Sequence, residues 1–97
     1  MNEYYRKVIK VVCDLTGLTE EEIAGKCRMR EYVDARCLVM RLLRDAGYYP
    51  SQIARVLGIS TRRVQKIIET FDDRVRFSAD PMLRCNLEEA TKILRRN

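Results

Sequence analysis

The chain is a series of short amphipathic segments separated by glycine or proline, and no stretch shows the two-residue alternation typical of a strand. Apolar residues at helical spacing, with Asn2 as a candidate N-cap, predict a first helix over residues 3–16. Thr19 and Glu22 then occupy the reciprocal positions of a capping box, which predicts a second, short helix running toward Gly25.

The longest helix is predicted over residues 31–46, and a glycine ends it. Its wide apolar stripe consists of Val33, Leu38, Met40, Leu42, Leu43 and Ala46. A proline at the first turn begins the next helix, over residues 50–57, and a further helix is predicted over about 60–71. After a break at 78–81, a short C-terminal helix is expected to begin after Asn86. The pattern predicts an all-α fold, a small helical bundle.

Residues 52–69 have the spacing of a helix-turn-helix. Two helices that cross steeply need a small residue where they approach, a glycine that ends the first helix, and an apolar residue in the turn. Ala54, Gly58 and Ile59 meet these needs in order, and Ser60 is placed to cap the second helix. The exposed side of that helix then presents Thr61, Arg62, Gln65 and Lys66. An ordinary helical hairpin with solvated arginines is the alternative, but the combined match favours DNA binding.

The net charge of +5 is unevenly distributed. Residues 26–66 contain ten basic and three acidic residues, a balance of +7, so the remaining segments sum to −2. Within this region, residues 26–30 alternate basic with apolar or sulfur side chains, as expected of a loop with one side turned to phosphate. A localised basic region of this kind indicates a phosphate-binding face. Arg41 and Arg44 are expected only to solvate a helix.

The four cysteines lack CxxC spacing and the chain has no histidine, so we expect reduced structural thiols, no metal and no cofactor. Without a histidine base, a phosphate loop or a nucleophile motif, an enzyme is not expected. No apolar run approaches the ~20 residues of a membrane span, and the start lacks the apolar core of a signal peptide. The lack of both segments predicts a cytoplasmic protein, and DNA binding predicts that it is associated with the nucleoid.

The order of these parts resembles the C-terminal DNA-binding domain of the bacterial chromosomal replication initiator DnaA, of the Trp-repressor-like helix-turn-helix superfamily. The segments that carry the resemblance lie within residues 4–71: Leu18–Ile23, the basic loop 26–30, Ala35-Arg36 with Leu38–Met40, and Tyr49–Ala54. Where the initiator has glycine-arginine-aspartate-histidine-threonine-threonine-valine, this chain has Gly58–Val64, without the aspartate and histidine.

The resemblance implies that the basic loop reaches the minor groove and phosphates while the second helix of the motif reads the major groove. The residues then expected to contact duplex DNA are Lys26, Arg28, Arg30, Arg36, Ser60, Thr61, Arg62, Arg63, Gln65 and Lys66. Arg62 or Arg63 is expected to bind guanine O6 and N7. The expected role is sequence-preferring DNA binding in replication or transcription control. The alternative is a protein-interaction module that uses Tyr48, Tyr49 and the C-terminal helix.

Two domain segments are expected: a helix-turn-helix domain over 1–76 that resembles the initiator domain, and a helical extension over 77–97. The extension either packs back on the domain or forms a homodimer with its copy. Packing back is favoured because so short a chain has little core to spare.

Overall fold

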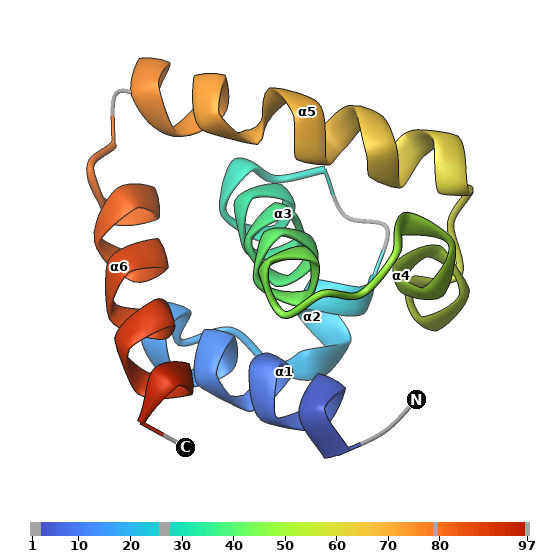
Figure 1. The fold of residues 1–97 in the computed structure, drawn as a ribbon. Helices are drawn as coiled ribbons and strands as arrows, with labels where there is room; N and C mark the ends of the chain where they lie inside the picture. Colours follow the sequence, from blue (N-terminus) through green and yellow to red (C-terminus); the bar gives the residue numbers. More distant parts are fainter. Residues whose placement is uncertain (1–2, 26–27, 79, 97) are drawn as a thin grey trace.

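The fold is built around one central helix. The computed structural model describes residues 3–25, 28–78 and 80–96, and these ranges contain helices and no strand, which confirms the all-α prediction. The helices are α1 (Glu3–Thr16), α2 (Glu20–Ala24), α3 (Arg30–Asp45), α4 (Pro50–Leu57), α5 (Thr61–Phe77) and α6 (Met82–Arg95). Figure 1 shows α3 in the middle, with α5 above it, α1 below, α6 on the left and α4 on the right. Asn2, the predicted cap of α1, lies outside the described residues.

Helix α3 is buried around most of its circumference because the other five helices all pack against it. Its buried residues are Ala35, Cys37, Leu38, Val39, Met40, Leu42 and Leu43. The predicted stripe is therefore too narrow, and Ala46 was wrongly included, since it is exposed at the end of the helix. A helix that is apolar on most sides is a core helix rather than a surface helix.

The capping box before α2 is confirmed. The Glu22 backbone N–H donates to Thr19 Oγ1 at 3.1 Å, and the Thr19 N–H donates to Glu22 Oε1 at 2.9 Å. Glu22 also accepts a hydrogen bond from the hydroxyl of Tyr32 at 2.8 Å, which ties α2 to α3. These bonds hold the pKa of Glu22 below its usual value, with the Thr19 backbone contributing most. The cap thus fixes both the start of α2 and its contact with the central helix.

Helix α5 is longer than predicted, because it continues to Phe77 instead of ending near residue 71. Arg41 of α3 explains the continuation: its Nη1 donates to Asp72 Oδ1 at 2.6 Å, and its guanidinium lies 5.3 Å from the centre of the buried Phe71 ring. Arg74 makes a second ion pair with Asp34 of α3. Arg41 is therefore a link between helices and not, as expected, a merely solvated residue.

Helix α6 begins at Met82, five residues before the start predicted after Asn86. Asp80 makes the earlier start possible, since its Oδ1 accepts the Met82 backbone N–H at 2.9 Å. Leu83 and Ala90 are buried where α6 packs on α1 and α3. The prediction that the C-terminal helix packs back on the bundle is confirmed.

Candidate nucleic-acid interface

The turn between α4 and α5 sets the angle of the motif. Gly58 has φ +70° and ψ +32°, a left-handed conformation that glycine adopts without steric cost. The backbone N–H groups of Gly58 and Ile59 both donate to the Ala54 carbonyl, at 2.9 and 3.1 Å. Ala54 is only 4% exposed, so the small side chain allows close packing at this crossing. The small residue and the glycine thus play the roles that the spacing predicted.

Ser60 caps the start of α5, since its Oγ accepts the Arg63 backbone N–H at 3.1 Å. Val64, one turn into the helix, is fully buried. The cap fixes where the helix begins and the buried valine fixes its rotation. The remaining side chains of the first two turns are therefore held at defined positions on the surface.

Five of the predicted contact residues are exposed on these two turns: Thr61, Arg62, Arg63, Gln65 and Lys66. At about 100° per residue, Arg62 falls near the centre of the exposed face, whereas Arg63 falls at its edge. None of the five takes part in an ion pair among the described residues. The structure thus brings a hydrogen-bonding, positively charged helix face to the surface.

The predicted basic loop divides into residues of different character. Lys26 lies outside the described residues, and Arg28 is exposed before α3. Arg36, inside α3, is half-buried, and its Nε donates to the carbonyl of Ile23 at 2.6 Å. That bond satisfies a carbonyl at the end of α2, so Arg36 has a structural role, and its contact with DNA stays a prediction.

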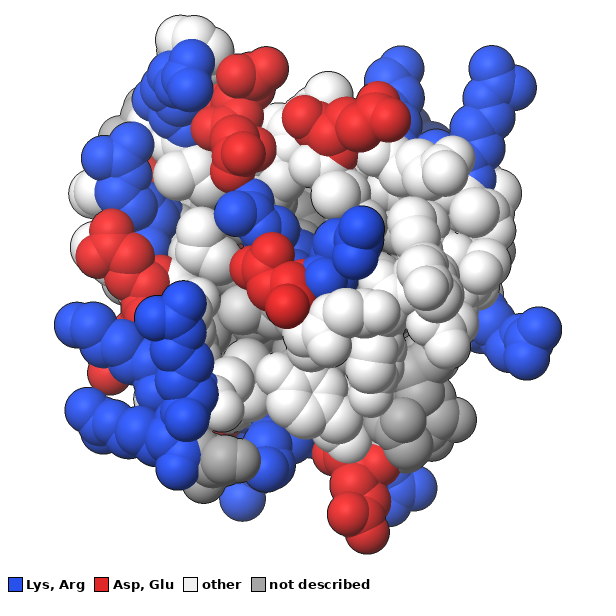
Figure 2. Space-filling model, in the orientation of Figure 1, with Lys and Arg blue, Asp and Glu red and all other residues white. Residues whose placement is uncertain are grey.

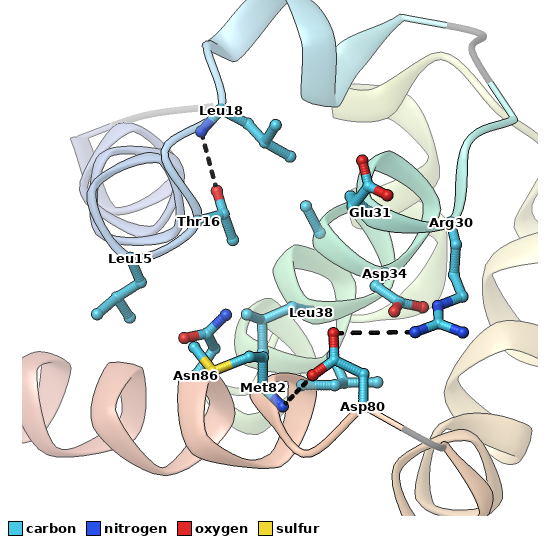
Figure 3. Close-up of a pocket in the computed structure, with 12 residues that line it drawn as sticks. Leu15, Thr16, Leu18, Arg30, Glu31, Asp34, Leu38, Asp80, Met82 and Asn86 are labelled. Atoms are coloured by element: carbon cyan, nitrogen blue, oxygen red, sulfur yellow. Dashed lines mark hydrogen bonds and ion pairs between the residues drawn. The ribbon is translucent and has the colours of Figure 1, made fainter.

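Arg30 points toward the segment that precedes α6. Its Nη2 lies 3.8 Å from Asp80 Oδ2, at the mouth of a surface cavity of about 570 Å³ between α1, α3 and α6 (Figure 3). Both side chains are about half exposed, at 59% and 46%. A pair this exposed contributes little to stability.

Arg55 is an exposed residue of α4 that the sequence prediction did not include. The first helix of a helix-turn-helix crosses the DNA backbone, so a cation on its surface is a candidate for phosphate contact. The signal was present in the sequence as the one basic residue of this helix, but spacing alone does not distinguish it from a solvated arginine.

Other kinds of site find no support in the described part of the chain. No group of three or more histidine, cysteine, aspartate or glutamate side chains there could hold a metal ion. Cys13, Cys37 and Cys85 are free thiols, and burial raises the pKa of Cys37. No helix in the described ranges is long and apolar enough to cross a membrane.

The region that contains the motif matches a known protein family. Residues 30–77 match the homeodomain-like domain family. This part of the chain is similar to homeodomain-like helix-turn-helix domains. The match begins with the first residue of α3 and ends with the last residue of α5, so the similarity covers the central helix and the motif packed on it.

Two curated relatives are similar over a longer part of the chain. Both are chromosomal replication initiator protein DnaA, from two strains of Leptospira biflexa serovar Patoc, and each is 32% identical over 73 residues. The aligned part covers 74% of this chain but only 17% of each initiator. The resemblance to the initiator's DNA-binding domain is confirmed, at a distant level. Together with the homeodomain-like domain, it supports DNA binding as the general function of this chain.

Proposed function

We propose that this protein binds duplex DNA with a preference for certain sequences, in the control of replication or transcription. The observation that carries the proposal is the face of α5 formed by Thr61, Arg62, Gln65 and Lys66, which is exposed while Ser60 and Val64 fix the helix beneath it. A rigid helix face with paired donors suits the major groove, where guanine offers two acceptors to one arginine.

In this arrangement the cations around the motif contact the backbone. Arg28 and Lys66 neutralise phosphates. Arg30 and Arg36 contact the backbone beside the basic loop, and Arg55 adds a contact from α4. Such contacts position the helix without reading sequence. Arg62, near the centre of the exposed face, is the better placed of the two arginines for guanine, and Arg63 is placed for an adjacent base or phosphate.

The test is fluorescence anisotropy with a random duplex pool and with a duplex that carries the initiator's box, each at two salt concentrations. Binding that weakens steeply with salt supports DNA binding, and preference for one duplex supports sequence reading. The missing aspartate and histidine make the initiator's box a stringent probe. Absence of binding at low salt contradicts the proposal and favours the protein-interaction alternative, for which the 67% exposed Tyr49 is available.

A further inference from the structure

A second group of positive charges lies where α1 and α6 meet. Tyr4, Leu94 and Arg95 line one shallow pocket, so the first turn of α1 adjoins the last turn of α6. Four exposed basic residues lie within a turn of this junction, and we call them the α1–α6 basic surface: Arg6, Lys7, Arg95 and Arg96. Figure 2 shows a dense group of blue side chains over the lower end of α6.

The charges of this surface are not neutralised by ion pairs within the described residues. Two carboxylates lie near this surface. Glu3 lies one turn before Arg6 and Lys7, and Asp45, which lines the same pocket, shares Arg41 with Asp72. Four positive charges against these two carboxylates, Glu3 and Asp45, leave a balance of +2. On α6, Lys92 is offset by Glu88 one turn earlier, so we do not count it.

Helix dipoles do not account for the whole group. Cations at the end of α6 interact favourably with the C-terminal end of its dipole, and Arg95 and Arg96 fit that role. Arg6 and Lys7, in contrast, lie near the start of α1, where the dipole disfavours positive charge. The dipole of α6 therefore explains the cations at its C-terminal end, but the dipole of α1 does not explain those near its start.

The α1–α6 basic surface lies apart from the motif. In Figure 1 the end of α6 and α1 form the lower edge of the molecule, whereas α5 begins at the upper right. The exposed acidic residues Glu69, Asp72 and Asp73 follow the contact residues along α5. The molecule measures 30 × 29 × 23 Å, several times the Debye length of ~8 Å at physiological salt. Phosphates bound at separate edges of such a body are largely screened from each other.

We propose that the α1–α6 basic surface is a second phosphate-binding surface, which holds the backbone of a second duplex while the helix-turn-helix holds the first. The inference rests on the proposed function, since it assigns the chain two DNA segments instead of one. The cations of this surface come from two helices and do not form one helix face that could enter a groove, so its contacts are to the backbone and do not depend on sequence. One chain could then bring two duplex segments together.

The experiment captures a fluorescent duplex on beads that carry a second, immobilised duplex, with the full chain added at low salt. The test variant is Arg95→Gln/Arg96→Gln. The control variant Arg76→Gln/Arg84→Gln removes the same number of exposed charges from the end of α5 and the start of α6. Circular dichroism checks that both variants fold, and sedimentation gives the oligomeric state. Anisotropy measures the affinity of each variant for a single duplex.

Wild-type chain and the control variant are expected to bridge the two duplexes. Arg95→Gln/Arg96→Gln is expected to reduce bridging at least about tenfold while single-duplex affinity changes less than about threefold, since the motif is intact. Bridging that persists in this variant overturns the inference, because two motifs in a dimer would then account for it. Single-duplex binding without any bridging by the wild type also overturns it. Failure to bind any duplex contradicts the proposed function instead.

Discussion

Arg30, the first residue of α3, forms an exposed ion pair with Asp80, on the segment before α6. The guanidinium that the basic loop was expected to offer to DNA lies 3.8 Å from a carboxylate oxygen on the segment before α6 (Figure 3). A phosphate must compete with this carboxylate for Arg30. Because the pair is exposed, breaking it costs little energy, and Asp80 therefore lowers the affinity of Arg30 for a phosphate only modestly.

Removing the Asp80 charge is therefore expected to strengthen binding. Asp80→Asn frees Arg30 while the amide oxygen can still cap α6, so we expect affinity for random duplex to rise about two- to fivefold and the salt slope to steepen by up to about one. Anisotropy over a salt series measures both. Asp73→Asn removes the same charge at an exposed position on α5, and an equal rise in that variant would show that net charge alone is responsible.

Arg62 and Lys66 of α5 are expected to contribute to DNA binding in different ways. Arg62→Ala should cost about 1–3 kcal/mol on the preferred duplex and relax the choice of base at one position. Lys66→Ala should weaken all duplexes similarly and flatten the salt slope by about one. Binding to a panel of single-base variants of the preferred site distinguishes the two effects. Equal losses on every duplex for Arg62→Ala would remove its base-reading role.

Gly58 is expected to be sensitive to any side chain. A Cβ at this position meets no atom within 4 Å, so the cost of Gly58→Ala is purely that of the φ of +70°. We expect a loss of about 1–2 kcal/mol in the free energy of unfolding, measured by urea denaturation. Gly58→Asn is the matched control, because asparagine tolerates the left-handed region better. A loss as large for asparagine as for alanine would point to a cause other than backbone strain.

The link between α3 and α5 is expected to weaken in acid. The hydrogen bond from Arg41 holds the pKa of Asp72 below its ordinary value of 3.8, so the folded state favours the charged carboxylate. Its stabilisation is fully present above pH 3.8 and is lost as the pH falls through the lowered pKa. The Tm difference between wild type and Asp72→Asn should thus be present at pH 7 and should vanish toward about pH 2. Asp73→Asn, which removes an exposed carboxylate that is in no ion pair among the described residues, is the control variant.

Most of the fold could be predicted because its signals are local. The extent of α1, the capping box at Thr19, the proline that begins α4 and the glycine at 58 depend on neighbours in sequence, and all four appear as predicted. The end of α5 and the start of α6 depend on distant partners. Arg41 stabilises the charged segment after Phe71, which by itself looks like the end of a helix.

The site was only partly predictable for the same reason. Helical spacing is enough to place Arg62 and Gln65 on the exposed face of α5. Sequence spacing does not show that Arg36 donates to Ile23, or that Arg30 rests against Asp80, because these pairs join residues 13 and 50 positions apart. Their expected role in DNA contact stays a prediction, now with the internal partners that a phosphate would have to replace.

Because α3 contacts each of the other five helices, its unfolding would remove the support of all of them at once. The motif has no separate core of its own, so a partly opened chain that still presents α5 is not expected. A protease would meet either the intact bundle or the open chain. The lifetime of this protein among proteases would then follow its global stability, and bound DNA would protect the whole chain, including α1 and α6.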